Sequence, residues 1–506
     1  MCGRGRWRMV PRLPRAHPCG HVCPHGPTGG PAMSAAHLSC DVAVVGAGPA
    51  GLAAARAAAE AGARVVCLDA FATPGGQYAM QPTQAESPFA ATAPVALGRA
   101  AARAAGEAGA QILCGAEVFW GACVPGGFCL SVNHAGRALA VEAKALVVAA
   151  GAMERPLPFP GWTLPGVIGA GAAQRLLKTG TGALPLPGKA VLAGSGPFLL
   201  AVAQSFAKAG QRLDHFVEMQ RPSPADVAKV FARHPGKLAE AARLGLDLRR
   251  SGAARHVGHM VTRALGTDRL EAVEIAPLSA SGQPVMGRAR VIEGVGTLAI
   301  GYGFQPVIDL TTALGAAHDF DAALGGWHCR ADAAGRTTVA GLWAAGETLG
   351  IGGAVPAQLS GRIAGAGAAR TLGFSAPDVT GATQALGNAR AFASALARLY
   401  PPPQDLPVAL PEDELICRCE DVTAGDIATT IAEGAHDSFA VKTWTRAGMG
   451  PCQGRICGAG IAAALAQAGV PADKASYNRA PLPLRPVPLP LVRAAMQAQT
   501  EMETRP

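Results

Sequence analysis

Residues 41–69 constrain the fold more than any other part of the chain. An apolar run is followed by glycines spaced as Gly-x-Gly-x-x-Gly, at Gly46, Gly48 and Gly51, and then by an Ala-rich stretch with helical periodicity. The first glycine makes a tight turn, the second lets a pyrophosphate approach the backbone, and the third lets the helix lie close to the strand. Asp69 ends the next apolar run, where an acid can bind ribose hydroxyls. We therefore predict a βαβ unit that binds a dinucleotide.

A second unit of the same kind occupies residues 189–218. Gly194 and Gly196 follow an apolar run and Glu218 ends the next one, but Leu199 stands where a third glycine is expected. That bulk should push the helix away from the strand unless something compensates for it. NAD(P), another adenine nucleotide or no ligand at all are open alternatives here. If NAD binds, Glu218 disfavours the phosphate of NADP.

Four cysteines near the C-terminus predict a metal cluster. Cys417 and Cys419 are separated by one residue, and Cys452 and Cys457 by four residues of a glycine-rich segment. Four thiolates from two short loops can hold a 2Fe-2S cluster, and nearby backbone N–H groups can tune its potential. Zinc is the alternative, but one residue between the first two cysteines is fewer than the roughly two to four typical of zinc sites.

The positive charge of the chain is concentrated at its beginning. The formal net charge is +9, and five arginines but no acid precede Met33, a second plausible start. The rest has no basic run, which argues against a nucleic-acid partner. The most apolar stretch, 190–207, has the glycine and proline order of a strand, turn and helix, so we predict no membrane anchor. Thirteen cysteines without a signal peptide favour a reducing cytoplasm.

Further motifs occur in a fixed order along the chain. They are Pro-Gly-Gly-Gln at 74–77, a buried strand ending in small residues at 146–151, and the segments 154–167, 301–304 and 338–353. With these, the chain resembles the two-dinucleotide-domain flavoproteins. Within them, residues 39–490 resemble the alpha (A) subunit of opine oxidases, the related proline and hydroxyproline dehydrogenases, and the B subunit of hydrogen cyanide synthase. The cysteine segment resembles the 2Fe-2S domain of the bacterioferritin-associated-ferredoxin (BFD) type.

The resemblance implies FAD at the first unit. It adds Gly76, Gln77, Gly151, Gly346 and Glu347 to the expected cofactor-binding residues, with Glu347 matching an acid, usually Asp, that holds the ribityl chain. Ala150 replaces a frequent Thr without removing backbone contacts.

Disulfide chemistry is not expected beside this flavin. Reductases of that kind need a cysteine pair there, and no cysteine lies between Cys67 and Cys114 or between Cys129 and Cys329. We interpret His328 as a packing or surface residue, and the Cys and His residues at 19–25 as a chance cluster.

The resemblance also implies a function. It is that of an FAD-dependent oxidoreductase, the electron-transfer alpha subunit of a heteromeric amino-acid or opine dehydrogenase, which passes electrons from a flavin to the 2Fe-2S cluster and an external acceptor. A separate FAD-dependent beta subunit would oxidise the C–N bond, so no catalytic residue is assigned to this chain. The alternatives are a self-contained NAD(P)H-dependent, ferredoxin-type acceptor reductase and an iron-sulfur redox sensor, which would not need an intact FAD fold.

The expected fold class is α/β, with two Rossmann-like dinucleotide-binding domains of the glutathione-reductase type and a small, mainly helical 2Fe-2S domain at the C-terminus. The expected segments are a disordered or misassigned extension (1–37), the first part of the FAD domain (38–165), the nicotinamide-type domain (166–297), the FAD-domain return segment (298–372), a helix and linker (373–411), the 2Fe-2S domain (412–475) and a Pro-rich tail (476–506).

Overall fold

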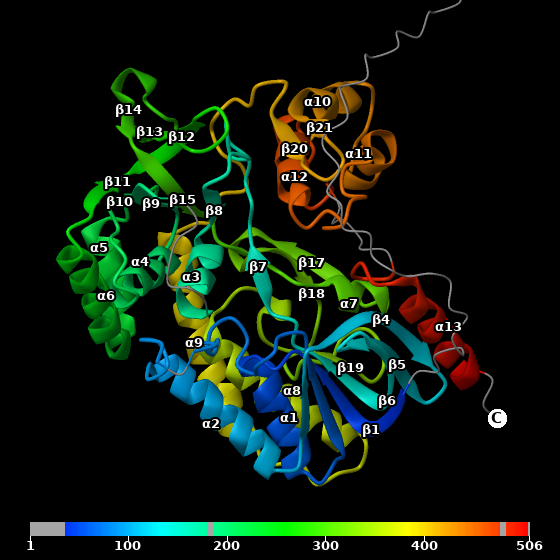
Figure 1. The fold of residues 1–506 in the computed structure, drawn as a ribbon. Helices are drawn as coiled ribbons and strands as arrows, with labels where there is room; N and C mark the ends of the chain where they lie inside the picture. Colours follow the sequence, from blue (N-terminus) through cyan, green and yellow to red (C-terminus); the bar gives the residue numbers. More distant parts are fainter. Residues whose placement is uncertain (1–35, 85, 180–186, 476–481, 504–506) are drawn as a thin grey trace, which may run out of the picture. The chain divides into compact units, whose positions relative to one another are not determined.

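The structure is a computed structural model and describes residues 36–84, 86–179, 187–475 and 482–503 (Figure 1). These residues all belong to one compact unit. The predicted extension, apart from its last two residues, lies outside the described residues, and so does the Cys and His cluster at 19–25. None of the described helices is long and apolar enough to cross a membrane.

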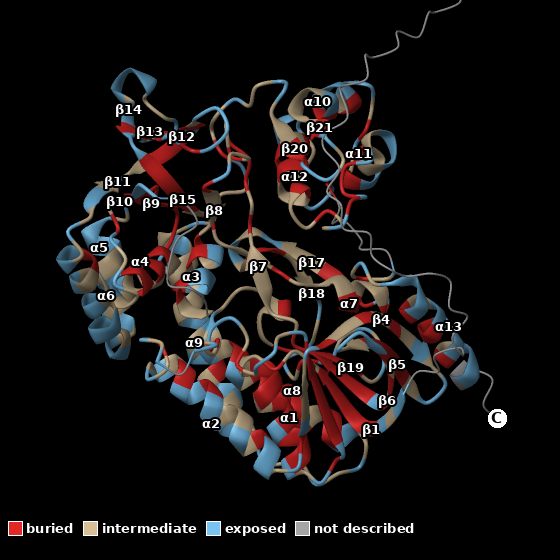
Figure 2. Ribbon diagram, viewed as in Figure 1, coloured by how far each residue is buried: buried red, intermediate tan, exposed pale blue. Residues whose placement is uncertain are grey.

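The first sheet carries the first predicted βαβ unit. Its strands β3, β2, β1 and β6 are parallel and adjacent in that order, β5 and β4 continue antiparallel from β6, and β19 pairs in parallel with β6. The strands are β1 (Ala36–Val45), β2 (Val65–Asp69), β3 (Gln111–Cys114), β4 (Ala116–Val124), β5 (Gly127–His134), β6 (Arg137–Val148) and β19 (Leu342–Ala344). Most residues of β2, β5 and β6 and of the second half of β1 are buried (red in Figure 2).

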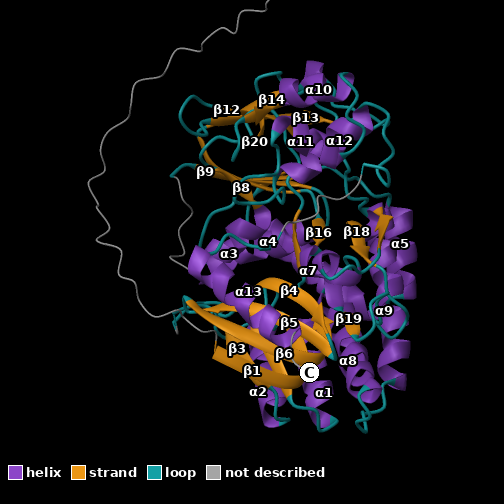
Figure 3. Ribbon diagram, turned by 90° about the vertical axis from the view of Figure 1, so that its right-hand side faces the viewer, coloured by secondary structure: helices purple, strands orange, loops and turns teal. Residues whose placement is uncertain are grey.

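Helices α1 (Pro49–Glu60), α2 (Ala93–Glu107) and α8 (Ala354–Thr371) pack against this sheet, and α9 (Thr380–Leu399) runs beside α8 (Figure 3). Helices α1 and α8 approach very closely: a Cβ at Gly361 or Gly365 of α8 would lie about 2 Å from a carbonyl oxygen of α1. Only glycine fits at these two positions, because any side chain would overlap that backbone.

The C-terminal segment supplies a further helix to this sheet. Helix α13 (Leu489–Glu503) buries Leu491, Ala494 and Ala495 against Phe119 and Ala138 of strands β4 and β6. Part of the segment expected to be only a Pro-rich tail therefore contributes to the core of the FAD-type domain.

The second sheet is fully parallel, in the order β11, β10, β9, β15, β8, and it carries the second predicted βαβ unit. Its strands are β8 (Val167–Gly169), β9 (Lys189–Gly194), β10 (His215–Glu218), β11 (Ala254–Val257) and β15 (Val295–Gly301), and its helices are α3 (Ala170–Thr179), α4 (Phe198–Lys208), α5 (Pro224–Arg233) and α6 (Leu238–Arg250). An antiparallel meander of β12 (His259–Leu265), β13 (Ala272–Pro277) and β14 (Arg290–Glu293) extends from it.

A narrow antiparallel ribbon connects the two sheets along the chain. It pairs β7 (Ala152–Glu154) with β16 (Phe304–Pro306). The short helix α7 (Asp309–Ala313) and the hairpin of β17 (His318–Asp321) and β18 (Gly326–Cys329) follow it. The 3-10 turns are η1 (Pro235–Lys237), η2 (Met286–Arg288), η3 (Ala322–Leu324) and η4 (Gly346–Leu349).

The cysteine module is small and mainly helical, as predicted. A short hairpin of β20 (Leu415–Cys417) and β21 (Val422–Thr423) precedes α10 (Ala424–Ala432), α11 (Ser438–Thr445) and α12 (Cys457–Gln467). Its core is formed by Ile416, Val422, Ile427, Val441, Ile461 and Leu465. Helix α10 begins with a reciprocal capping box between Thr423 and Asp426, which fixes where the helix starts.

Candidate cofactor sites

The loop between β1 and α1 has the geometry that the glycine spacing predicts. Gly46 has a φ of +103°, and a Cβ there would lie 2.3 Å from the carbonyl oxygen of Ala149. A Cβ at Gly51 would lie 1.6 Å from the carbonyl oxygen of Gly46. Glycine is therefore required at both positions, and the N-terminus of α1, which has no acid in its first turn, faces the turn.

Asp69 lies at the end of β2, directly beside this loop. Its carboxylate accepts a hydrogen bond from the backbone N–H of Ala47 at 2.5 Å and another from Phe71 at 2.7 Å. The side chain is buried, and burial raises the pKa of this carboxyl above its usual value. The acid is thus within reach of a ribose placed on the glycine turn.

The other residues expected at the FAD site lie around the same turn. A Cβ at Gly76 would lie 2.9 Å from the Cα of Gly48, so these two glycines bring two backbone segments into close approach. The Gln77 side chain donates to the carbonyl of Ala152 at 3.3 Å, next to Gly151. Gly346 also approaches α1, because a Cβ there would lie 2.8 Å from the Cβ of Ala50.

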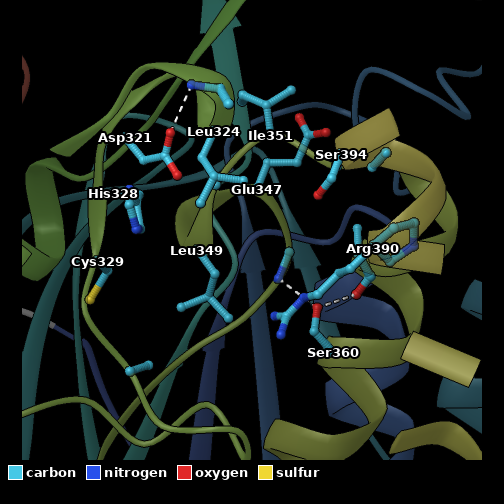
Figure 4. A pocket seen from close by; sticks show the side chains of 18 of the residues that line it. Asp321, Leu324, His328, Cys329, Glu347, Leu349, Ile351, Ser360, Arg390 and Ser394 are labelled. Carbon is cyan, nitrogen blue, oxygen red and sulfur yellow. Dashed lines mark hydrogen bonds between the residues drawn. The ribbon is translucent and has the colours of Figure 1, made fainter. Parts of the chain in front are cut away.

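Glu347 faces the start of α8. Its Oε1 accepts a hydrogen bond from the backbone N–H of Gly353 at 2.9 Å, and burial raises the pKa of its carboxyl. It lines a cavity of about 400 Å³ together with Leu324 and His328 (Figure 4), and Gly346, another residue expected at the FAD site, lines the same cavity. His328 therefore lies at a cavity wall, where its Nδ1 is 3.1 Å from the Gly326 carbonyl oxygen.

These residues fit FAD. The turn offers a helix N-terminus and a glycine cradle for a pyrophosphate, with a buried acid beside it for ribose hydroxyls. Thr348 follows Glu347 in η4, and its buried hydroxyl has no hydrogen-bond partner among the described residues. Buried polar groups are rarely left unpaired, so this hydroxyl is available to a bound group.

The second glycine turn repeats the arrangement of the first. A Cβ at Gly194 would lie 1.8 Å from the Gly301 carbonyl oxygen, and Gly196 has a φ of +106°. The Glu218 carboxylate accepts hydrogen bonds from the backbone N–H groups of Gly196 at 3.1 Å and Gln220 at 2.9 Å. Burial raises the pKa of Glu218 to about 7. The buried hydroxyl of Ser195 has no partner in the described part of the chain.

Leu199 does not disrupt this unit. The side chain is fully buried in the core formed by α3, α4 and the second sheet. The neighbouring strand residue is Gly301, where a Cβ would lie 3.4 Å from Leu199 Cδ2 and 3.1 Å from the Cβ of Ala170. Leu199 thus packs at van der Waals distance from the Gly301 position, and its bulk is accommodated in this core.

The interdomain linker crosses the second turn, which the sequence did not predict. The Cβ of Tyr400 lies 4.0 Å from the position of a Cβ at Gly196, and the side chain of Gln220 donates to the Pro401 carbonyl at 3.4 Å. Arg155 Nη1 donates to the Pro403 carbonyl at 3.2 Å. The linker is thus held against both the second nucleotide-type turn and the ribbon between the sheets.

The four predicted cluster ligands come together as two pairs. Cys419 and Cys452 are close enough to shift each other's pKa, and Cys417 is close enough to raise the pKa of Cys457. A Cβ at Gly450 would lie 2.1 Å from the Cβ of Cys419, so glycine is needed where the two loops meet. Across the described ranges, no group of three or more His, Cys, Asp or Glu side chains surrounds a single metal position. Two pairs of thiols suit the two irons of a 2Fe-2S cluster.

The environment of Cys452 favours a thiolate. Burial acts to raise the pKa of this thiol, but hydrogen bonds from the backbone N–H groups of Ile456, Gly454 and Arg455 and from the Cys419 thiol together outweigh it, and the pKa is lowered. By contrast, burial raises the pKa values of Cys419 and Cys457, as does the neighbouring cysteine of each pair. Thiolates buried with such N–H donors are suited to binding iron and to setting its potential.

The cysteine module is held against the segment 158–162 and the ribbon. Trp162 Nε1 donates to the carbonyl of Leu415 at 2.8 Å, and the backbone N–H of Gly161 donates to Glu414 at 2.9 Å. The guanidinium of Arg418 stacks over the Trp162 ring at 4.9 Å. The sequence marked the segment around Trp162 only through a family resemblance, and in the structure it forms the interface that positions the module.

Arg455, which the sequence did not single out, joins the second cysteine loop to Asp309 through an ion pair of 2.9 Å. The only signal for it was its place between Cys452 and Cys457.

Comparison with known proteins agrees with this architecture. Residues 40–370 match the family described as pyridine nucleotide-disulphide oxidoreductase, and residues 415–467 match the BFD-like [2Fe-2S] binding domain. The chain is 33% identical to the A subunit of opine oxidase from Agrobacterium tumefaciens (strain Ach5), covering 89% of this chain and 90% of that protein. It is 34% identical to HcnB, a subunit of hydrogen cyanide synthase from Pseudomonas protegens, covering 69% and 74%.

Among solved structures, L-proline dehydrogenase from P. horikoshii has a similar fold. The TM-score is 0.63 at 19% identity, covering 91% of this chain and 80% of that one. The predicted fold class is confirmed, and so are the predicted cofactor types, FAD and a 2Fe-2S cluster. The chain belongs to the pyridine nucleotide-disulphide oxidoreductase family and is an FAD-type oxidoreductase that carries a BFD-like [2Fe-2S] domain.

Proposed function

We propose that this chain is the electron-transferring alpha subunit of a heteromeric dehydrogenase that oxidises the C–N bond of an amino acid or opine. The relatives from opine oxidase and hydrogen cyanide synthase are subunits by name, and the fold is shared with an L-proline dehydrogenase. The observation that carries the proposal is a direct contact: Gln305 of the ribbon leaving the FAD site donates to the carbonyl of Arg455, in the loop between two cluster ligands, at 3.4 Å.

The proposed division of labour follows from this arrangement. FAD exchanges electrons with two-electron donors, and a 2Fe-2S cluster accepts one electron at a time. The substrate amine would lose two electrons and one proton on a partner FAD-dependent beta subunit, giving an iminium product that water hydrolyses. In this chain, residues 46–51, Asp69 and Gln77 would hold FAD, and the two cysteine pairs would hold the cluster that passes electrons to an external acceptor or electron-transfer chain.

A self-contained NAD(P)H-dependent reductase is the second candidate. The retained glycine turn at Gly194 and Gly196 favours it, but the linker at Tyr400 lies against the same turn, where the pyrophosphate of NAD(P) would bind. Mixing the oxidised protein anaerobically with NADH and with NADPH separates the two candidates. We expect the flavin absorbance to persist with both; rapid bleaching by either would reject the proposed relay role.

The decisive experiment is co-purification with a candidate FAD-dependent beta subunit, followed by a screen of amino acids and opines with an artificial electron acceptor. We expect turnover only from the complex. Cys452→Ser in this chain should leave substrate-dependent flavin reduction intact while transfer to the acceptor is lost. Substrate oxidation by the isolated chain would contradict the proposal.

A further inference from the structure

Arg455 lies between Cys452 and Cys457, and its guanidinium is largely buried, with 11% of the side chain exposed. Its Nε and Nη2 donate to Asp309 Oδ2 at 3.1 and 2.9 Å. Its Nη1 donates to the carbonyl of Cys452 at 3.2 Å. Nearly all donors of this side chain are used, so it is held in one orientation.

Asp309, the acid that pairs with Arg455, lies in the part of the chain that packs on the first sheet. Asp309 begins α7, and the next residue, Leu310, is buried in the core formed with strands of the first sheet. Arg455 Nη2 also donates to the carbonyl of Leu484, which lies in that same core. One side chain therefore fastens the second cysteine loop to the sheet beside the FAD site.

Hydrogen bonds and strand pairing through the ribbon connect this loop to the predicted flavin turn. Gln305 donates to the Arg455 carbonyl, and β16 containing Gln305 pairs with Met153 of β7. The next residue in the ribbon, Ala152, accepts from Gln77 at 3.3 Å. The cysteine loop and the predicted flavin contacts are thus positioned by one short stretch of backbone.

The charge of Arg455 is oriented as well as fixed. The guanidinium contacts the backbone carbonyl of the cluster ligand Cys452 on one side and Asp309 on the other, so the positive end of the ion pair lies at the backbone of the cluster loop. Adding an electron makes a cluster more negative, and a nearby positive charge in a poorly solvated site stabilises that state. Burial keeps this influence from being screened as it would be at the surface.

We propose that Arg455 is a positioning residue for electron transfer, which fixes the cluster loop against the FAD-binding body through Asp309 and raises the reduction potential of the cluster. The inference rests on the proposed function, since it requires that Cys417, Cys419, Cys452 and Cys457 hold a 2Fe-2S cluster.

The test uses the full chain loaded with FAD and the cluster. Arg455→Gln removes the charge, Arg455→Lys keeps the charge but loses the forked hydrogen bonds, and Asp309→Asn keeps Arg455 while removing its partner. The control is Arg446→Gln, in the same module, because Arg446 is 71% exposed and pairs with Glu420 within that module. Two quantities are measured: the cluster potential, by a redox titration followed by electron paramagnetic resonance (EPR), and the rate of flavin-to-cluster transfer after rapid anaerobic photoreduction.

In Arg455→Gln we expect the one-electron equilibrium constant for cluster reduction to fall about tenfold, equivalent to about 59 mV. In Arg455→Lys the potential should stay close to that of the wild type while transfer slows at least threefold. Asp309→Asn should also slow transfer without lowering the potential. The control should change neither quantity.

An unchanged potential and an unchanged transfer rate in Arg455→Gln, with the cluster present, would overturn the inference and leave the proposed function standing. If Arg455→Gln fails to assemble the cluster, the Lys and Asn variants decide: slowed transfer supports the inference, and wild-type transfer in both overturns it. A wild-type protein with FAD but no iron-sulfur signal would overturn both the inference and the proposed relay.

Discussion

The carboxylate of Glu218 accepts a hydrogen bond from the backbone N–H of Gly196 at 3.1 Å, so the acid at the end of β10 lies on the glycine turn that begins α4. Asp69 stands in the same relation to Ala47 in the first unit. In both units the acid therefore binds the backbone of the glycine turn where a nucleotide would lie. The two turns differ in their neighbours. The second turn is also approached by Tyr400 of the linker.

Glu218 makes the stability of the nucleotide-free protein depend on pH. Burial raises its pKa to about 7 from 4.5, so the folded state holds this proton more tightly and stability falls as the pH rises between those values. Glu218→Gln should remove that loss, and its free energy of unfolding relative to wild type should rise by about 2–3 kcal/mol from pH 5 to pH 8. Denaturant titrations at several pH values measure this. Glu107→Gln, at the exposed end of α2, is the control, and parallel curves for Glu218→Gln and wild type would contradict the prediction.

Gly51 should be essential for FAD binding. A Cβ at this position would lie 1.6 Å from the Gly46 carbonyl oxygen, so α1 or the turn must move in Gly51→Ala. We expect FAD to bind at least tenfold more weakly, measured as the flavin content after purification and by titration of the apoprotein. Gly106→Ala in α2 is the matched control, because a Cβ there meets nothing within 4 Å. It should retain FAD and gain about 0.5–1 kcal/mol of stability. Full FAD retention by Gly51→Ala would show that the turn tolerates a displaced helix.

Cys452→Ser should abolish the iron-sulfur absorbance and EPR signal and leave FAD in place. This thiol carries the backbone N–H donors that favour its thiolate, and its loss leaves one pair incomplete. Cys123→Ser removes an exposed cysteine outside the module and should keep both cofactors. Metal analysis distinguishes the alternative: zinc in place of iron in the wild-type protein would contradict the cluster assignment.

The sequence predicted the parts of this structure that depend on local chemistry. Gly46 and Gly51 are required by one tight turn, because Gly46 has a positive φ and a Cβ at Gly51 would overlap the Gly46 carbonyl. The spacing of the four cysteines indicates two short loops. The segment containing Leu491, Ala494, Ala495 and Ala498 also carries a helical apolar spacing, but the prolines before it led us to predict only a Pro-rich tail without a core of its own.

Contacts between distant segments could not be predicted in this way. Arg455 and Asp309 are 146 residues apart, and the residues around each of them do not indicate that the two side chains pair. The approach of Tyr400 to Gly196 depends equally on how a linker folds back over a finished domain. The packing of Leu199 beside Gly301 depends on the order of strands in the second sheet, since those two residues meet only after β15 has paired with β9.

Trp162 should control how firmly the cysteine module is held. Its indole N–H donates to the carbonyl of Leu415 at 2.8 Å, and Trp162→Phe keeps most of the packing while leaving that carbonyl without this donor. A lost hydrogen bond of this kind costs about 1–3 kcal/mol, so the module should separate more often from the segment 158–162. We expect faster proteolysis within the linker at 400–411 and an unchanged cluster EPR signal. Trp120→Phe, in β4 of the first sheet, should show wild-type proteolysis. Equal cleavage rates in Trp162→Phe and wild type would mean that the remaining contacts, such as Glu414 with Gly161, suffice to hold the module.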